Sequence, residues 1–400
     1  MPATKSISVK SVEAEAPRLG WRFARLDSVC QIRHGGTPSK DVPEYWRGSL
    51  PWASPKDMWV DLVENTQDHI SEEAVRQSAT NIAGEDSLLV VIRSGILARR
   101  FPVAMAATRL AYNQDIKALL PDRAAIDPWF LFYVLRATEQ EVLAHGVKKG
   151  ATVHSIKSGF LEALRVPLPP LPEQRRIAAG LRDRLAEVTK ASASVQVQTE
   201  TLDKLIHAVL RESLRMGSPQ PARLADCLHE VTDGIGEDWR SYPVLGATRG
   251  GLAPAKEGVG KNPGRYKPVR PGTIFYNPMR ILLGSIAMLE EDDAPGVTSP
   301  DYVVMTAVEG RLSPRWFYHW FPSQYGAEFI KSMTRGAVRE RLLFKRLAPA
   351  TLLLPDWNHQ QAAASQMAAI RQAKAKLADQ LAALDHLPAA LLRDAFSGRL

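Results

Sequence analysis

The sequence contains only two cysteines among its 400 residues, Cys30 and Cys227. They stand far apart and form no Cys-x-x-Cys pair, the spacing typical of structural zinc sites. We therefore expect neither a zinc site nor a disulfide framework, and we expect both thiols to be buried, unreactive packing residues in a reducing compartment. The histidines are also scattered, and none has a recognisable spacing from a cysteine or serine; those considered are His34, His145, His154 and His207.

Long hydrophobic runs are missing as well. No stretch approaches the roughly 18 uninterrupted apolar residues of a membrane-spanning helix. The N-terminal residues 1–20 are mostly polar and lack the apolar segment of a signal peptide. We expect residues 1–20 to form a flexible tail, and the protein to be cytoplasmic and not associated with a membrane.

The chain also lacks the motifs of common nucleotide-dependent and cofactor-dependent enzymes. It has no GxxxxGK[ST] phosphate-binding loop, and the glycines of Gly258–Gly264 have the wrong spacing. The sequence "NPMR" from Asn277 lacks the second proline and the aromatic residue of the motif found in amino-methyltransferases. The carboxylate run Glu290–Asp293 is typical of a solvated turn and not of a metal site. We therefore expect no catalytic residue, metal site or cofactor in this chain.

The sequence does contain an internal repeat. A shift of 186 residues, which brings Asp115 onto Asp301, aligns the middle of the first half with the second half without gaps. The register holds over about 60 residues, which is long for a chance match. The chain is therefore predicted to contain two similar globular units. The identical pairs are Asp115/Asp301, Pro128/Pro314, Gly150/Gly336, Ala151/Ala337, Leu168/Leu354, Pro169/Pro355 and Gln174/Gln360.

A long helical segment follows each predicted unit. Prolines between Val166 and Glu173 end the first unit, because proline disrupts both strand pairing and helices. Glu173 suits a helix N-terminus, and a helix that continued to Met216 would be about 66 Å long. We expect the second helix to start near His359 and to be interrupted near Pro388.

Both helical segments carry apolar residues at intervals of seven, which indicates that each helix packs along another helix. An amphipathic helix lying on its own domain would show a similar pattern, but two matched helices in one chain favour antiparallel pairing with each other. The shift here is 182 residues (Val188 to Ile370), so the first helix has about one extra turn. The predicted pairing residues are Leu181, Val188, Val195, Leu202 and Val209 in the first helix and Ile370, Leu377, Leu384 and Leu391 in the second.

These patterns predict an α+β protein with approximate two-fold symmetry, in which two globular domains of mixed β-sheet and short helices accompany an antiparallel coiled coil. The expected boundaries are a first domain over 21–172, a central spacer helix over 173–217, a second domain over 218–355 and a C-terminal spacer helix over 356–400. Two similar domains on a spacer suit a partner with two separated sites. Duplex DNA is such a partner, because its surface repeats about every 34 Å.

Clusters of basic residues form the candidate binding surface. The net charge is +8, and Arg249–Leu289 contains seven basic residues against one acidic residue, Glu257. Ser87–Gln114 contains arginines and no acidic residue. Lysine and arginine displace counterions from phosphates, and bidentate arginine, asparagine or glutamine side chains read base edges. The candidate DNA-binding residues are Arg33, Lys40, Lys56, Arg99, Arg100, Lys148 and Lys149 in the first unit, and Arg249, Lys261, Arg265, Asn277, Arg280, Arg335 and Arg339 in the second.

Aromatic residues are interpreted differently from the basic clusters. The runs Pro128–Leu135 and Arg315–Phe321 are typical of core helices. Tryptophan buries a large apolar surface, so we expect these side chains to fill cores or to brace loops. The tryptophans concerned are Trp46, Trp52, Trp59, Trp129, Trp316, Trp320 and Trp357.

Several segments together resemble the specificity subunit of type I restriction-modification enzymes. They are His34–Met58, with its Gly-Gly-Thr-Pro-Ser sequence, Arg93–Pro121, Pro167–Ala178, with its Pro-Leu-Pro-Glu-Gln sequence, Tyr266–Met288, Gly296–Met305 and Leu391–Leu400. The resemblance covers nearly the whole chain after residue 20. The start of the second helix, Asp356–Gln360, departs from the pattern.

The resemblance implies that each unit is a target recognition domain for one half of a bipartite, asymmetric DNA sequence. It implies that the helices set the gap and dock two methyltransferase subunits, which two restriction-translocase subunits then join. S-adenosylmethionine, ATP and Mg²⁺ are expected only on those partners, and this chain is expected to be non-catalytic. Two alternatives stay open: a scaffold with two protein-binding heads, without salt-dependent DNA affinity, or an enzyme with fused recognition domains, which requires a cofactor loop.

Overall fold

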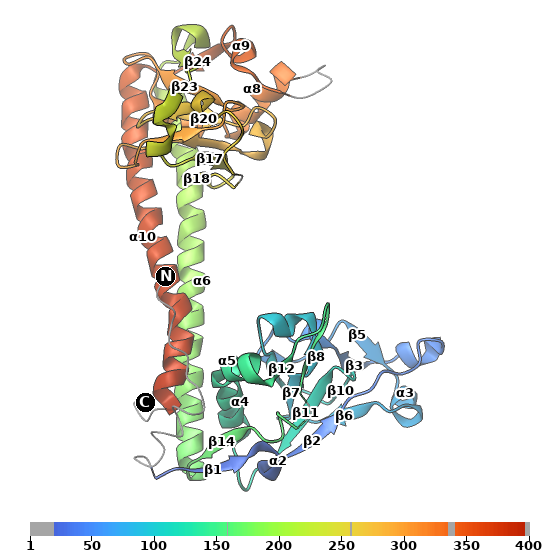
Figure 1. The fold of residues 1–400 in the computed structure, drawn as a ribbon. Coiled ribbons are helices and arrows are strands. Elements are labelled where there is room, and N and C mark those ends of the chain that lie inside the picture. The colour runs from blue at the N-terminus through green and yellow to red at the C-terminus, as the bar shows by residue number, and fades with distance from the viewer. Residues whose placement is uncertain (1–19, 158, 257, 335–340, 397–400) are drawn as a thin grey trace. The chain divides into compact units, whose positions relative to one another are not determined.

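The computed structural model describes residues 20–157, 159–256, 258–334 and 341–396. Its described part divides into two compact units (Figure 1). Unit 1 comprises the described residues within 1–193 and 381–400, and unit 2 comprises those within 194–380. Each unit combines β-sheets with helices, so the predicted α+β class is confirmed.

The core of unit 1 is a five-stranded sheet of order β2-β11-β7-β9-β4. Its neighbouring strands are antiparallel except for the parallel pair β9 and β4. Every residue of β7 (Leu88–Val91) and β9 (Val103–Ala106) is buried, because both faces of these central strands are covered. The other strands of this sheet are β2 (Cys30–His34), β11 (Ile116–Pro121) and β4 (Leu62–Val63).

Smaller sheets and short helices surround this sheet in unit 1, with strand orders β5-β3-β10-β6, β12-β13-β8 and β1-β14. The strands are β1 (Arg22–Arg25), β3 (Leu50–Ala53), β5 (Asp68–Ile70), β6 (Asn81–Ala83), β8 (Arg93–Ser94), β10 (Leu110–Tyr112), β12 (Val147–Lys148), β13 (His154–Ile156) and β14 (Arg165–Leu168). The α-helices are α2 (Leu26–Val29), α3 (Glu72–Gln77), α4 (Pro128–Ala137) and α5 (Glu139–Glu141). The 3-10 helices are η1 (Pro43–Trp46), η2 (Pro55–Asp57) and η3 (Gly95–Ala98), and η4 (Val142–Gly146) is a π-helix.

Unit 2 is built around a four-stranded antiparallel sheet of order β16-β23-β20-β21, which repeats the order β2-β11-β7-β9 of unit 1. These strands are β16 (Leu228–Glu230), β23 (Val303–Ala307), β20 (Ile274–Tyr276) and β21 (Ile286–Met288). The paired strands around them are β15 (Gln220–Arg223) with β24 (Thr351–Leu354), β17 (Leu245–Thr248) with β18 (Gly251–Pro254), and β19 (Lys267–Val269) with β22 (Gly296–Thr298). The helices are α7 (Pro314–Trp320), α8 (Gln324–Thr334), α9 (Phe344–Leu347) and the 3-10 turns η5 (Leu224–Asp226), η6 (Gly236–Ser241), η7 (Pro263–Arg265) and η8 (Ile281–Leu283).

Two long helices, α6 (Leu171–Met216) and α10 (Trp357–Phe396), each contribute residues to both units. In unit 2, Nζ of Lys374 on α10 lies 2.5 Å from a carboxylate oxygen of Asp203 on α6. Gly217, just after α6, packs close to His359 near the start of α10, since a Cβ at Gly217 would lie 3.0 Å from the Cβ of His359. The two helices therefore run antiparallel in this unit.

The predicted pairing residues of these helices are buried to different degrees. Leu181 and Val195 of α6 and Ile370 of α10 are buried. In unit 1, Leu181 shares an apolar core with Leu392 and Phe396 of α10. The remaining pairing residues are half-buried: Val188, Leu202, Val209, Leu377, Leu384 and Leu391.

The predicted interruption of the second helix near Pro388 is wrong, because α10 continues through Pro388 to Phe396. A proline inside a helix removes a backbone hydrogen bond and costs about 3 kcal/mol. Packing beyond the proline offsets this cost. Leu392, Ala395 and Phe396 are buried in the core of unit 1, and the Phe396 ring packs edge-on against Phe130 with 5.6 Å between the ring centroids.

A buried glutamine fixes each long helix to the globular part of a unit. In unit 1 the Oε1 of Gln174 accepts a hydrogen bond from the N–H of Asp127 (2.8 Å), and its Nε2 donates to the carbonyl oxygens of Ala125 (3.1 Å) and Pro169 (2.8 Å). Asp127 in turn caps α4, because its side chain accepts from the N–H of Phe130. Gln360 makes the equivalent bonds in unit 2, to the N–H of Ser313 (2.9 Å) and to the carbonyl oxygens of Arg311 (3.1 Å) and Pro355 (2.8 Å).

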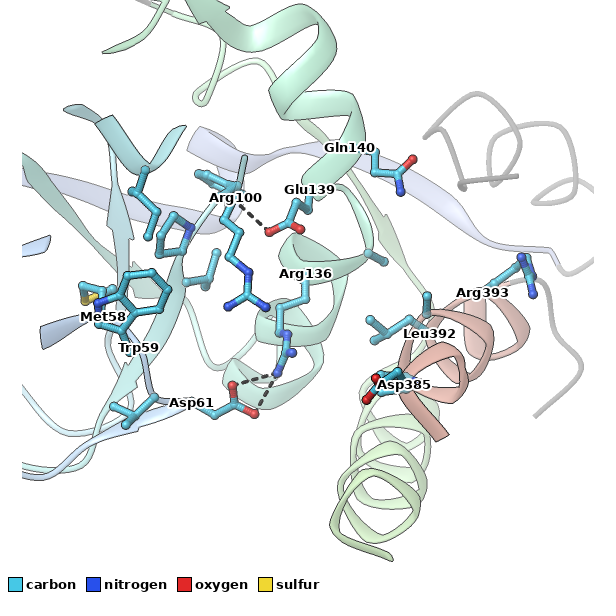
Figure 2. A pocket seen from close by; sticks show the side chains of 18 of the residues that line it. Met58, Trp59, Asp61, Arg100, Arg136, Glu139, Gln140, Asp385, Leu392 and Arg393 are labelled. Carbon is cyan, nitrogen blue, oxygen red and sulfur yellow. Dashed lines mark hydrogen bonds and ion pairs between the residues drawn. The ribbon is translucent and has the colours of Figure 1, made fainter. Parts of the chain in front are cut away.

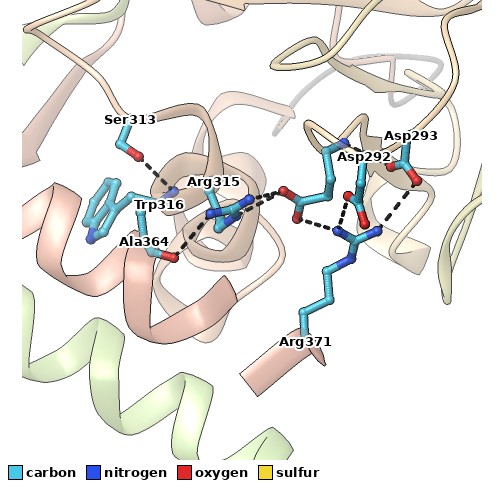
Figure 3. A network of polar contacts seen from close by, with 8 residues as sticks. Asp292, Asp293, Ser313, Arg315, Trp316, Ala364 and Arg371 are labelled. Atoms are coloured by element: carbon cyan, nitrogen blue, oxygen red, sulfur yellow. Dashed lines mark hydrogen bonds and ion pairs between the residues drawn. The ribbon is translucent and has the colours of Figure 1, made fainter. Parts of the chain in front are cut away.

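The prediction that Glu290–Asp293 is a solvated turn is wrong for Glu290. Its side chain is 7% exposed and accepts a hydrogen bond from Nε of Arg315 at 3.0 Å (Figure 3). Arg371 of α10 lies 3.9 Å from this carboxylate, 3.0 Å from that of Asp292 and 3.5 Å from that of Asp293. A buried carboxylate needs such cationic partners. The acidic run therefore joins the turn to α7 and α10 within unit 2.

Both cysteines are buried and unbonded, as predicted from the sequence. Burial raises the pKa of Cys30 to about 12, which keeps its thiol protonated at neutral pH. No helix in the described ranges is long and apolar enough to cross a membrane.

Candidate nucleic-acid interface

One edge of the five-stranded sheet of unit 1 collects most of the predicted residues. The strands β2 and β7 end at this edge, and β11, β9 and β4 begin there, because of their antiparallel and parallel pairings. Neighbouring strands lie about 4.8 Å apart, so loops from all five strands fall within about 20 Å. Lys40, Lys56, Arg99 and Arg100 belong to these loops, and Arg33 is the next-to-last residue of β2.

Two glycines let the chain after β2 pass between neighbouring strands at this edge. A Cβ at Gly35 would lie 2.1 Å from the carbonyl oxygen of Asn113, and one at Gly36 would lie 2.6 Å from the backbone just before β6. No other residue fits there without moving the backbone. The glycines place Thr37 so that its hydroxyl donates to the side-chain oxygen of Gln114, in the turn before β11. Thr37 and Gln114 are exposed polar residues of this edge that the sequence did not single out.

The candidate cations of unit 1 differ in whether a carboxylate pairs with them. Nζ of Lys56 lies 2.8 Å from a carboxylate oxygen of Asp68, in an exposed pair worth up to about 1 kcal/mol. A phosphate could replace Asp68 at little cost. The other six candidate cations of unit 1 are exposed, and no carboxylate in the described ranges pairs with them. They can therefore displace counterions from phosphates. These six are Arg33, Lys40, Arg99, Arg100, Lys148 and Lys149.

Lys148 reaches the same edge through the small sheet β12-β13-β8. It is paired across the strands with Ser155, which is paired with Arg93. Nε of Arg93 donates to a carboxylate oxygen of Asp115 at 2.6 Å, in the turn before β11. Arg93 is thus a further cation of this edge. Its sequence signal was its position in the acid-free segment Ser87–Gln114.

The predicted residues of unit 2 gather at the equivalent edge of its sheet, where β16 and β20 end and β23 and β21 begin. Asn277 and Arg280 belong to the loop between β20 and β21. Arg265 lies beside the loop after β16, since a Cβ at Gly234 would lie 2.7 Å from the Cα of Arg265. The two units therefore present the same edge, although their loops differ in sequence.

The hairpin β17–β18 adds Arg249 to this edge. A Cβ at Gly284, in the loop after β20, would lie 3.4 Å from Cγ of Arg249. Lys261 lies in the segment before η7, and both cations are exposed. No described carboxylate pairs with Arg249, Lys261, Arg265 or Arg280. The candidates Arg335 and Arg339 lie outside the described residues.

Asn277 has a structural contact of its own. Its side-chain oxygen accepts a hydrogen bond from the N–H of Met279 at 3.0 Å, and its carbonyl oxygen accepts from the N–H of Arg280 at 3.0 Å. These bonds close the turn that carries Arg280. The side-chain NH₂ group is the part of Asn277 that remains for a ligand.

Tyr112 lies behind the edge of unit 1, at the end of β10. Its side chain is fully buried, and its hydroxyl has no hydrogen-bond partner among the described groups. Burial raises its pKa to about 12, with a small opposing effect from Arg33. Burying a hydroxyl without a hydrogen-bond partner costs desolvation free energy that nothing offsets. The Tyr112 hydroxyl lies next to the loops that would contact a ligand.

A cleft of about 480 Å³ opens at the β4 and β9 end of the edge of unit 1 (Figure 2). Asp61 in this cleft accepts two hydrogen bonds from Nη1 of Arg136 at 2.7 and 2.8 Å. Glu139 accepts a hydrogen bond from the N–H of Phe101 at 3.0 Å. The Arg100 guanidinium lines the same cleft without a described carboxylate partner. The cleft is completed by residues of α10, among them Asp385, His386 and Leu392.

The interpretation of the tryptophans as core or loop-bracing residues is wrong for Trp59. Trp59 lines the cleft and is 64% exposed, although Met58, directly before it, is buried. The others fit the prediction: Trp52, Trp316 and Trp320 are buried, and Trp46, Trp129 and Trp357 are half-buried.

Comparison of the sequence with protein families finds a match over the first unit. Residues 19–195 match the family described as the type I restriction modification DNA specificity domain. A segment of 144 residues is 38% identical to the specificity subunit of the type I restriction enzyme EcoR124I/EcoR124II of Escherichia coli, and it covers 36% of this chain and 35% of that protein. The matched segment thus spans about a third of the length of that relative.

Comparison of the fold extends the similarity to most of the chain. A chain from a study of complex assembly and conformational transition of the type I R-M system has a TM-score of 0.65 and 15% identity, covering 95% of this chain and 98% of that one. The HsdS subunit of Thermoanaerobacter tengcongensis has a TM-score of 0.55 and 18% identity, covering 95% of this chain and 97% of that one. These structures share the fold of the chain.

Proposed function

We propose, on the premise that this chain belongs to the family of type I restriction-modification specificity subunits, that it is the DNA-binding specificity subunit of such an enzyme. Each unit binds one half of a bipartite, asymmetric target. The helices α6 and α10 set the gap between the two halves. The chain itself carries out no catalytic step.

The observation that carries this proposal is the equivalent basic edge of the two units. In both, the loops at one edge of the central sheet present exposed arginines and lysines that no described carboxylate pairs with. Exposed cations without a carboxylate partner are suited to phosphates, and arginine also reads guanine in the major groove. The loops differ between the units, so each unit has its own half-site.

The proposed partners beyond DNA are two methyltransferase subunits, docked along α6 and α10, and two restriction-translocase subunits. S-adenosylmethionine, ATP and Mg²⁺ are bound by those partners in this proposal. The methyltransferase subunits transfer a methyl group to N6 of an adenine within the target that this chain selects.

The proposal is tested by an adenine-methylation map of the host genome with and without this gene. We expect one interrupted, asymmetric motif to lose methylation when the gene is removed. An unchanged map, in cells where the methyltransferase subunits are present and active, would contradict the proposal.

A second measurement distinguishes a DNA-binding protein from a scaffold that binds only other proteins. Affinity for a duplex that contains the mapped motif should fall steeply as salt is raised, because bound cations release condensed counterions from the phosphates. A scaffold with two protein-binding heads would show no such dependence.

A further inference from the structure

We propose that Trp59 and Arg100 form a DNA-contacting pair in unit 1, in which the indole packs against a base and sugar and the guanidinium binds the adjacent phosphate. This inference rests on the proposed function and assigns the cleft of unit 1 to one strand of the bound duplex. Both side chains line that cleft (Figure 2).

The exposure of Trp59 is the first observation behind the inference. Trp59 is 64% exposed and its neighbour Val60 is 50% exposed. A large apolar side chain next to another exposed apolar residue leaves considerable apolar surface in contact with water, which is typical of an interaction site. Nothing in the described core requires the indole at this position.

The backbone on both sides of Trp59 is fixed. Met58 is buried, with 4% of its surface exposed. The carbonyl oxygen of Asp61 accepts a 2.8 Å hydrogen bond from the N–H of Met105 in β9, and the Asp61 carboxylate is held by Arg136. Trp59 is therefore presented outward by an anchored loop, so its contact with a ligand would cost little ordering entropy.

Arg100 is presented in the same way from the loop after η3. Its N–H donates to the carbonyl oxygen of Ile96 at 3.0 Å, and the next residue, Phe101, is 2% exposed. Arg136 and Glu139 elsewhere in the cleft already have partners, whereas Arg100 has no described carboxylate. The cleft thus combines an aromatic surface with an available cation, the pair of groups that binds nucleic-acid strands.

The loop that carries Arg100 adds positive charge, which favours DNA over a protein segment. Arg99, next to Arg100 in the chain, is exposed, and no described carboxylate pairs with it. Unit 2 places aliphatic side chains beside a cation at its equivalent edge, where Leu283 is 71% exposed and Met279 is 55% exposed in the loop that carries Arg280. Apolar side chains within basic loops are a recurrent means of contacting bases.

The test uses the full chain assembled with its methyltransferase subunits and a labelled duplex that contains the mapped motif. Fluorescence anisotropy at several salt concentrations gives the affinity and its salt dependence. We expect Trp59→Ala to weaken binding about tenfold without changing the salt dependence, because an aromatic contact releases no counterions. Arg100→Ala should lower the slope of log affinity against log salt by about one.

Two controls accompany these variants. Trp59→Phe keeps an aromatic ring and should retain most of the affinity. Leu353→Ala removes another exposed apolar side chain, 56% exposed on β24 in unit 2, and should bind as the wild type does. If removing any exposed apolar side chain lowered the affinity for DNA, Leu353→Ala would also bind the duplex more weakly than the wild type.

Three results would overturn the inference. If the wild type binds the duplex and Trp59→Ala binds it with the same affinity, Trp59 does not make the assigned contact. The proposed function would stand in that case. Loss of the methyltransferase subunits from Trp59→Ala would show that the cleft binds protein. Absence of motif-dependent binding by the wild-type complex would refute the proposed function together with the inference.

Discussion

The side-chain oxygen of Gln174 accepts a 2.8 Å hydrogen bond from the backbone N–H of Asp127. Gln174 is fully buried, and both hydrogens of its NH₂ group are donated to backbone carbonyl oxygens. Glutamine is required here because glutamate lacks the two donors and leucine lacks every polar group. The same arrangement in Gln360 shows that the internal repeat extends to individual hydrogen bonds.

Replacement of this side chain should therefore destabilise unit 1. Gln174→Leu leaves one N–H and two carbonyl groups without partners in a buried setting, and we expect a loss of about 3 kcal/mol in the free energy of unfolding. Urea unfolding followed by circular dichroism measures the change. Gln196→Leu, at an exposed position on the same helix, should stay near the wild type, and equal losses in both variants would contradict this role for Gln174.

Tyr112→Phe should not destabilise the protein. The substitution removes a buried hydroxyl without a described partner, and its desolvation cost disappears with it. We expect the free energy of unfolding to stay unchanged or to rise by about 1 kcal/mol. A marked fall in the thermal unfolding temperature would show that this hydroxyl has a partner in solution.

Arg280→Ala should weaken DNA binding by unit 2 and reduce its salt dependence. Arg280 is exposed and no described carboxylate pairs with it, so a bound phosphate would release one counterion through it. We expect the slope of log affinity against log salt to fall by about one. Arg215, already paired with Glu212 at 2.8 Å on α6, gives the matched control Arg215→Ala, for which the slope should not change.

Deletion of residues 191–194 in α6 should change the gap of the DNA target and leave its half-sites unchanged. Four residues are about one helical turn and shorten a helix by about 6 Å. A methylation map of cells that carry the deletion reads the gap directly. The same gap as in the wild type would contradict a role for α6 as the spacer.

His319 should make stability depend on pH on the acidic side. Burial lowers its pKa to about 4, with further effects from Arg315, Lys374 and His207, against an ordinary value of 6.5. The unfolded chain therefore binds more protons between these two values, and stability falls as the pH is lowered through that window. The loss should reach at most about 3 kcal/mol. His319→Gln should flatten this part of the stability curve, measured by urea unfolding at several pH values.

The repeat and the long helices could be predicted from the sequence because their signals are local. Prolines between Val166 and Glu173 mark the end of a globular segment, and the heptad seam from Leu181 repeats within one helix. The identical positions of Gln174 and Gln360 revealed the repeat, although their hydrogen-bond roles needed the structure.

The burial of a side chain could not be predicted from local sequence patterns where it depends on residues far away in the sequence. Glu290 lies in an acidic run, and its burial depends on Arg315 and Arg371, which are remote in sequence. Trp59 has a large apolar side chain of the kind that usually fills a core, yet it is 64% exposed in the folded protein. A basic cluster shows that a surface is charged, but the sheet topology determines which of its members share an edge.

Unit 1 is made of two chain segments that are separated in sequence by unit 2, whereas unit 2 is one continuous stretch. Phe396, which packs against Phe130, is synthesised only after the whole of unit 2. The earlier-made unit therefore cannot close its core until the later-made unit has been synthesised, and the usual order of co-translational folding is reversed. A ribosome that stalls in α10 would leave the first-made half of the protein unfinished.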